Sequence, residues 1–337
     1  MSSRTGLKRV GHQRLTLRLA ALCGPTTTLL ELAAKHPSPA ARTALDTAFA
    51  VVGSHRGPKV ETRNLVLDGP AGALAARLFE PDCIEAGAGL LAYFHGGGFV
   101  LGSIESHANT CRFIAAHAGC RVLSVAYRQP PEAPFPAAFD DALAAYRWTV
   151  AHASDVGAEP LRIGVGGDSA GGNLAAAVAL AAADDDVAPC FAWIQYPVVD
   201  GDLAAYPSAR SFADRPLLTL RAAQRMLRHY VPDDRDRTDP RFSVTHAAGL
   251  SRMPPTYIAT AGMDPLRDQG ERFAEQLRAA GVAVEARRFE GLPHGFELLL
   301  VDREARAATA ETCSELARGL NRAVRPTTKR DERLCVT

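Results

Sequence analysis

From residue 90 onward, short apolar runs of strand length alternate with longer segments that have helical spacing. The run Leu90–Phe94 is uninterrupted, which is typical of a strand that is buried on both faces. Similar runs begin at Val122, Leu161, Ala192 and Thr256. Buried strands that alternate with helices predict a parallel sheet covered by helices on both faces. We therefore expect an α/β fold with a mostly parallel, doubly wound sheet.

The segments between these runs carry apolar residues on one helix face. Phe139, Leu143, Tyr146 and Val150 follow one another at intervals of four, three and four residues, which places them on a single face. The other expected helices span 170–183, 266–280 and 303–324, and the other expected strands span 60–67, 74–79 and 282–289.

Two segments do not follow this alternation. Residues 1–57 are expected to be helical, with breaks at Gly24-Pro25 and at 36–39, and to lie outside the sheet because the strand pattern begins only near Val60. Residues 201–250 are rich in Asp, Arg and Pro and are interpreted as an insertion that lies over the sheet. The predicted division is an N-terminal segment 1–57, a core of 58–200 and 251–325, an insertion 201–250 with a helix at 220–230, and a disordered tail 326–337.

The composition excludes several classes of partner. The 337 residues are 47% hydrophobic and 22% charged, with a formal net charge of +1, so nothing favours nucleic acid or an anionic membrane surface as a partner. No run reaches the ~18 apolar residues of a membrane span. Arg18 interrupts the N-terminal stretch that superficially resembles a signal peptide. We expect no nucleic-acid partner and no stable membrane insertion.

The seven cysteines are odd in number, irregularly spaced and without a C-x-x-C pair. This pattern argues against a disulfide framework and against a zinc site, and it favours a reducing compartment. The expected location is therefore cytoplasmic. The sequence also lacks an H-E-x-x-H motif, and no metal is expected.

A glycine-flanked serine lies between the strand expected at residue 161 and the helix at 170–183. The segment Gly167-Asp168-Ser169-Ala170-Gly171 fits the pattern G-x-S-x-G. In such a strand-to-helix turn the serine is strained, and neighbouring side chains clash unless they are Gly. The hydroxyl then stands beside a helix N-terminus, where negative charge is favoured. The motif alone also fits a simple glycine-rich connection, so Ser169 enters as a candidate nucleophile.

The same loop begins like a dinucleotide-binding fingerprint. Gly164 and Gly166 match its first two glycines, but Ser169 occupies the third position. The acidic run Asp184-Asp185-Asp186 lies at the end of the helix, whereas a ribose needs an acid at the tip of the next strand. We therefore expect no nicotinamide, flavin or other cofactor.

A second motif, His95-Gly96-Gly97-Gly98, directly follows the run Leu90–Phe94. Three consecutive glycines let the backbone approach a substrate closely and turn two amides toward one point. Backbone N–H groups of this kind stabilise the oxyanion of acyl transfer. Its position at a strand end, upstream of the serine turn, is the one that an oxyanion loop requires.

An acid and a histidine follow two later strands. Asp264 comes directly after the strand at residue 256, although an Asp before Pro265 is also a normal helix cap. The rival acid Asp268 lies about one turn inside the helix, so we favour Asp264. His294 lies in a loop after the last expected strand. It completes the order Ser, Asp, His along the chain.

In combination, these motifs resemble the hormone-sensitive-lipase-like family of α/β-hydrolases, in its microbial carboxylesterase branch. The resemblance covers about residues 60–320. Further matches are Tyr127-Arg128, Pro131-Glu132, Phe135-Pro136-Ala137-Ala138 and Tyr196-Pro197-Val198-Val199-Asp200, and departures occur at Gln129-Pro130 and Ala133.

The resemblance implies an α/β-hydrolase fold in which a helical cap is built from the N-terminus and a mid-chain insertion. It implies that Ser169 is the nucleophile, His294 the base and Asp264 its orienting acid. The implied oxyanion donors are the amides of Gly97, Gly98 and Ala170, supported by the other residues of the two motifs, His95, Gly96, Gly167, Asp168 and Gly171.

The sequence thus predicts a serine carboxylesterase that hydrolyses short-to-medium acyl esters through an acyl-serine intermediate. Its expected partner is a small-molecule ester. Hydrolysis of amides, thioesters or lactones uses the same groups and stays open, as does a non-catalytic small-molecule receptor on the same fold. The natural substrate and the oligomeric state, including a homo-oligomer, also stay open.

Overall fold

The computed structural model describes residues 8–10, 17–55, 57–85, 87–214 and 217–321. These residues form a nine-stranded sheet with the order β1-β9-β8-β7-β6-β4-β5-β3-β2. The pairings of β3 with β2 and β5 are antiparallel, and the others are parallel. The strands are β1 Lys8–Val10, β2 Val60–Gly69, β3 Gly72–Pro81, β4 Leu90–Phe94, β5 Arg121–Val125, β6 Ile163–Asp168, β7 Ala192–Gln195, β8 Thr256–Met263 and β9 Val284–Pro293.

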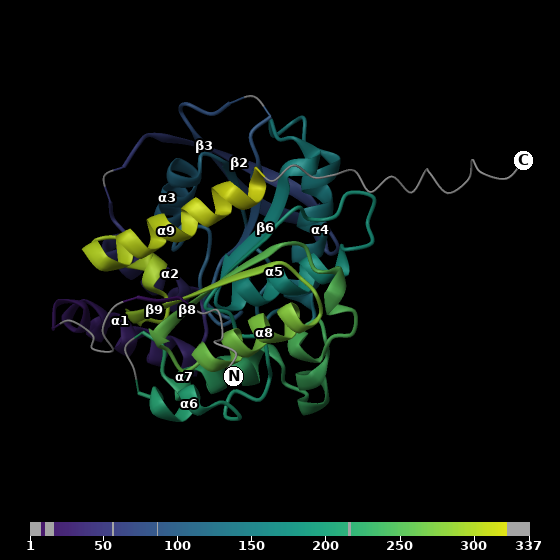
Figure 1. Cartoon of the computed structure of the whole chain (residues 1–337). Helices are drawn as coiled ribbons and strands as arrows, with labels where there is room; N and C mark the ends of the chain where they lie inside the picture. The colour runs from purple at the N-terminus through teal and green to yellow at the C-terminus, as the bar shows by residue number, and fades with distance from the viewer. Residues whose placement is uncertain (1–7, 11–16, 56, 86, 215–216, 322–337) are drawn as a thin grey trace, which may run out of the picture.

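Helices cover both faces of the sheet (Figure 1). On one face α3 packs against α9, and on the other α4 packs against α5, with α8 beside it. The helices are α1 Leu17–Lys35, α2 Pro39–Val52, α3 Ala108–Ala118, α4 Ala137–Ala151, α5 Ala170–Ala181, α6 Pro207–Ser211, α7 Leu220–Tyr230, α8 Arg267–Ala279 and α9 Arg303–Leu320. Every residue of β4, β5, β6, β7 and β8 is buried, which confirms the doubly covered parallel sheet predicted from the apolar runs.

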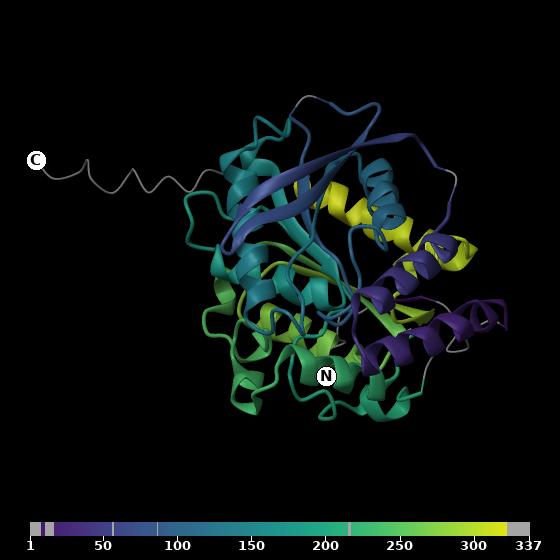
Figure 2. The ribbon, with the colours of Figure 1, turned by 180° about the vertical axis from the view of Figure 1, so that it is seen from behind.

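The N-terminal helices lie beside the insertion rather than against the outer faces of the sheet. Seen from behind in Figure 2, α1 and α2 lie next to each other, and α1 contacts α7 of the insertion. The hydroxyl of Thr27 on α1 accepts a hydrogen bond from the amide of Leu217 at 2.7 Å. Glu31 on α1 forms an ion pair with Arg225 on α7 at 3.3 Å. Two segments far apart in sequence are thereby joined.

Two expectations for the N-terminus are wrong. Residues Lys8–Val10 join the sheet as β1, parallel to β9, because an edge strand offers unpaired backbone groups to any extended segment. A three-residue strand has no apolar periodicity that the sequence could reveal. The break expected at Gly24-Pro25 does not occur, since α1 continues through Pro25. The later break is confirmed: α1 ends at Lys35, and Ser38 caps α2.

Other boundaries move by a few residues. The strand expected from Leu161 begins at Ile163, because Pro160–Arg162 forms a 3-10 turn. Helix α3 was not expected from the sequence. The tail 326–337 and the end of the expected last helix lie outside the described residues. Within the described ranges, no helix has the length and apolarity needed to cross a bilayer.

Candidate active site

Parallel strands bring four predicted segments to one edge of the sheet. Ser169 follows β6, the glycine loop that begins at His95 follows β4, Asp264 follows β8 and His294 follows β9. All four strands run parallel within one sheet. Their carboxyl ends therefore meet at the same edge, where open α/β sheets place their sites.

Ser169 occupies the sharp turn between β6 and α5. Its φ of 56° and ψ of −115° belong to a region that non-glycine residues rarely adopt. A Cβ at Gly167 or at Gly171 would clash with the carbonyl oxygen of Phe94, so only glycine fits on either side. The amide of Ser169 donates to the carbonyl of Gln195 at 2.8 Å. This hydrogen bond to the neighbouring strand β7 stabilises the strained turn.

The three side chains predicted to be catalytic form one chain of hydrogen bonds. Nε2 of His294 lies 2.9 Å from Oγ of Ser169, and Nδ1 lies 2.7 Å from Oδ2 of Asp264. Because the carboxylate accepts, Nδ1 carries the hydrogen, and Nε2 is left as an acceptor for the serine O–H. Ser169 is 8% exposed, His294 6% and Asp264 0%. The base and the acid are almost shielded from water, while the hydroxyl still reaches the cavity.

The structure brings Asp264, and not Asp268, to His294. Oδ1 of Asp264 also accepts a hydrogen bond from the amide of Leu266 at 2.7 Å. Asp264 therefore both caps the following turn and pairs with His294. Asp268 lies inside α8, where it accepts the amide of Ser208 at 2.8 Å. It therefore joins α8 to α6.

The glycine loop after β4 has a backbone that only glycine adopts easily. Gly97 and Gly98 have φ values of 114° and 61°, and a Cβ at Gly98 would clash with Met226 of α7. In the part of the chain that the structure describes, the N–H groups of Gly97, Gly98 and Ala170 donate to no other protein group. Gly97 and Gly98 line the cavity above Ser169. These amides are thus available to a substrate oxygen.

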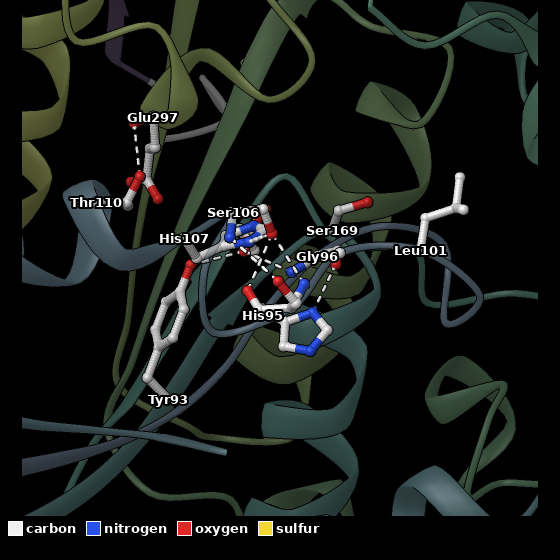
Figure 3. Close-up of polar contacts among 12 residues, drawn as sticks. Tyr93, His95, Gly96, Leu101, Ser106, His107, Thr110, Ser169 and Glu297 are labelled. Atoms are coloured by element: carbon white, nitrogen blue, oxygen red, sulfur yellow. Dashed lines mark hydrogen bonds and ion pairs between the residues drawn. The ribbon is translucent and has the colours of Figure 1, made fainter. Parts of the chain in front are cut away.

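A buried polar cluster lies beneath this loop (Figure 3). Asp168 accepts hydrogen bonds from Tyr93 and from the amide of Gly96, and His107 lies beside it. Burial raises the pKa of Asp168, but the charge of His107 and the three donors outweigh it, so the pKa lies below its ordinary value. Burial, followed by the charge of nearby His107, lowers the pKa of His95 to about 3. His95 is therefore neutral.

Sequence reasoning missed Tyr93 and His107 as neighbours of the site. Tyr93 lies within the apolar run of β4 and looks like an ordinary core residue. His107 precedes the unexpected helix α3. It is one of the ten histidines of the chain, and no motif distinguishes it. The departure at Gln129 also acquires a role, because its side chain donates to the carbonyl of Leu101 at 2.8 Å and so supports the glycine loop.

Two apolar lobes of a cavity meet at Ser169. They share Gly98, Ser169, Leu218 and Met226. The first spans about 350 Å³, open solvent included, and is also lined by Phe99, Val198, Leu203, Ala223, Leu227, Phe242 and Leu266. The second spans about 420 Å³, open solvent included, and is also lined by Leu30, Phe49, Gly97, Asp168, Leu217, His294, Gly295 and Leu298.

Both N-terminal helices contribute to the second lobe, Leu30 from α1 and Phe49 from α2. Leu217, Leu218 and Met226 of the insertion close it from the other side. Among the described residues, no group of three or more His, Cys, Asp or Glu side chains is placed to hold a metal ion.

The architecture and the sequence both have known counterparts. Residues 91–298 match the model of a family described by its alpha/beta hydrolase fold. Esterase LipI of Mycobacterium tuberculosis is 42% identical over 243 residues, which are 71% of this chain and 76% of that protein. The chain belongs to the hormone-sensitive-lipase-like family of α/β-hydrolases.

A further relative and two solved structures extend the similarity. Carboxylic ester hydrolase LipN of the same organism is 43% identical over 79% of this chain and 73% of its own length. A crystal structure of LAE6, an alpha/beta hydrolase enzyme from the metagenome of Lake Arreo, superposes with a TM-score of 0.83. It has 35% identity and covers 91% of this chain and 99% of that one. The hyperthermophilic esterase of Pyrobaculum calidifontis has a TM-score of 0.81 at 30% identity, over 90% and 98% of the two chains.

Proposed function

We propose that the protein is a carboxylic ester hydrolase in which Ser169 is the nucleophile, His294 the general base and Asp264 the acid that orients it. The observation that carries the proposal is the continuous hydrogen-bonded chain from Ser169 through His294 to Asp264. Relatives named as esterases, at about 40% identity over most of the chain, support the same reaction class.

The reaction follows from the hydrogen positions. Nε2 of His294 takes the proton of Ser169 as Oγ attacks the ester carbonyl. The amides of Gly97, Gly98 and Ala170 donate to the oxyanion of the tetrahedral intermediate. His294 then gives the proton to the leaving alcohol, which leaves an acyl-serine. Water activated by His294 releases the acid.

The position of His294 assigns the two lobes. The alcohol must leave beside Nε2, from which it receives its proton. His294 lines only the second lobe, so the alcohol occupies the lobe formed by Leu30 and Phe49. The acyl chain then enters the first lobe, whose lining residues are almost all apolar and include no charged side chain. Phe242 and Leu266 help to enclose it. Short-to-medium uncharged acyl chains are the class that this lobe accommodates.

The test is covalent labelling combined with a substrate series. A fluorophosphonate should modify Ser169, and Ser169→Ala should abolish labelling and lower ester turnover by about 10³-fold or more, since the three residues act as a unit. The p-nitrophenyl esters should be cleaved best at short-to-medium acyl length. Labelling of another residue, or undiminished turnover in Ser169→Ala, would contradict the proposal.

A further inference from the structure

A buried carboxylate lies directly before the proposed nucleophile. Asp168 is 2% exposed, and its Oδ1 accepts the hydroxyl of Tyr93 at 2.7 Å and the amide of Gly96 at 2.8 Å. The proposed reaction assigns this carboxylate no step. A buried charge is retained only where it is paired and hydrogen-bonded.

The partner of this carboxylate is His107, which is 1% exposed. Nε2 of His107 lies 3.3 Å from Oδ1 of Asp168, and Nδ1 lies 2.8 Å from Oγ of Ser106. Figure 3 shows Ser106 and His107 together in the cluster that includes His95 and Gly96.

The contact with Asp168 fixes the hydrogen on one ring nitrogen of His107. A lone pair on Nε2 would face a carboxylate oxygen and be repelled, so Nε2 carries hydrogen. Nδ1 lies against Oγ of Ser106, which also bonds to the backbone of Ser103. His107 is thus a buried neighbour whose Nε2 faces the Asp168 carboxylate at 3.3 Å.

This pair connects the glycine loop to the serine turn. Asp168 is covalently joined to Ser169, while its carboxylate holds the amide of Gly96, which precedes Gly97. A Cβ at Gly96 would clash with the Asp168 carboxylate, so the motif glycine permits this close approach. The donors on the loop and the donor at Ala170 are thus fixed relative to each other through one side chain.

We propose that Asp168 and His107 are positioning residues that hold the oxyanion loop against the nucleophile turn, with His107 keeping the Asp168 carboxylate in place beneath the loop. The inference rests on the proposed roles of Gly97, Gly98 and Ala170 as oxyanion donors. Without His107, the Asp168 carboxylate loses its buried neighbour and shifts, and this shift releases Gly96. Oxyanion donors act mainly in the transition state. Their displacement therefore lowers kcat and leaves KM little changed.

The experiment compares His107→Gln and Asp168→Asn with the wild type on one p-nitrophenyl ester. We expect kcat to fall about 10- to 100-fold, as for a displaced oxyanion donor, with KM within about twofold. Affinity for a trifluoromethyl ketone, which forms an anionic adduct with the serine, should fall in parallel. His117→Gln is the matched control, because His117 is an exposed histidine at the far end of the same helix, α3, and should retain wild-type kcat.

The double variant separates a shared role from two unrelated defects. If the pair acts as a unit, His107→Gln combined with Asp168→Asn lowers kcat by about as much as one variant alone. Additive losses, or a rise in KM at constant kcat, would overturn the inference. If His107→Gln does not fold by circular dichroism, Tyr93→Phe removes another donor to the same carboxylate, and it should lower kcat with KM unchanged. Failure of the proposed function is seen separately, as absence of fluorophosphonate labelling at Ser169 in the wild type.

Discussion

Asp264 serves two neighbours at once, because one carboxylate oxygen meets Nδ1 of His294 and the other meets the amide of Leu266. Asp264→Asn preserves the shape but lets the amide group donate, which favours the wrong histidine tautomer. We expect kcat for p-nitrophenyl esters to fall by about 10³- to 10⁴-fold. Asp268→Asn should change kcat little, since Asp268 joins α8 to α6 and pairs with Arg267, away from His294. The reverse ranking of the two variants would make Asp268 the orienting acid.

Glu297 is a buried acid near the same histidine loop. It is fully buried, and burial, followed by the charge of Asp168, raises its pKa well above the ordinary value. The folded protein therefore keeps this carboxyl protonated to a higher pH than the unfolded chain, which ionises it above about pH 4.3. The stability that the neutral group contributes is complete below that pH. It declines as the pH rises toward the folded-state pKa.

Glu297→Gln removes this dependence because the amide is neutral at every pH. We expect the variant to gain stability relative to the wild type between pH 5 and pH 8, with the difference vanishing near about pH 4. Urea denaturation at each pH measures the free energy of unfolding. An equal pH slope in the two proteins would show that Glu297 is ionised in the folded state.

Local motifs made most of the site predictable at this scale. The glycines around Ser169 and after β4 are needed where they stand, because a Cβ there would clash with backbone or with the side chains of Asp168 and Met226, so they leave a pattern in the sequence. His107 leaves no such pattern in the sequence. It is needed because of its contact with Asp168, which is distant in sequence and becomes its neighbour only when the sheet forms.

At the scale of elements, α2 and α7 line different lobes of the cavity. Phe49 of α2 contributes only to the proposed alcohol lobe, and Ala223 of α7 only to the proposed acyl lobe. Ala223→Leu should fill the acyl lobe and shift the preference toward acetyl esters. Phe49→Ala should enlarge the range of accepted alcohols and leave the acyl preference unchanged. Kinetics on two ester series, one varied in the acyl chain and one in the alcohol, measure both. Exchanged phenotypes would mean that the lobes are assigned the wrong way round.

The bounds of an element were predictable where the periodicity of its apolar residues determines them. They were not predictable where tertiary contacts determine them. Leu220–Tyr230 was expected as a helix, and α7 has those bounds, because its apolar face is regular. Pro25 lacks the amide that an inner helix turn needs, yet α1 continues through it. Nearby, the hydroxyl of Thr27 bonds to the carbonyl of Cys23 at 2.8 Å, and α1 packs on both α2 and α7. Packing outweighs local propensity there.

At the scale of the whole molecule, the N-terminal segment touches both the sheet and the insertion. β1 extends the sheet beside β9, and Glu31 of α1 pairs with Arg225 of α7. We propose that α1, α2 and the insertion act together as a cap over the site. An apolar cavity that is closed by a cap excludes water from the oxyanion, which strengthens each donor.

Removing residues 1–35 tests the cap directly, because it deletes α1 and exposes Leu217 and Leu218 of the cavity wall. The central strands gain their stability from α3, α5, α8 and α9, so the far-ultraviolet circular dichroism of the core should persist. Ester turnover should fall at least about 10-fold as water enters the site, and the selectivity between short and long alcohols should weaken. Glu31→Gln, which removes only the charge that pairs with Arg221 and Arg225, should produce a smaller change in the same direction. A truncated protein with normal turnover and unchanged selectivity would show that α1 is a stabilising attachment, and that α2 and α7 alone enclose the substrate.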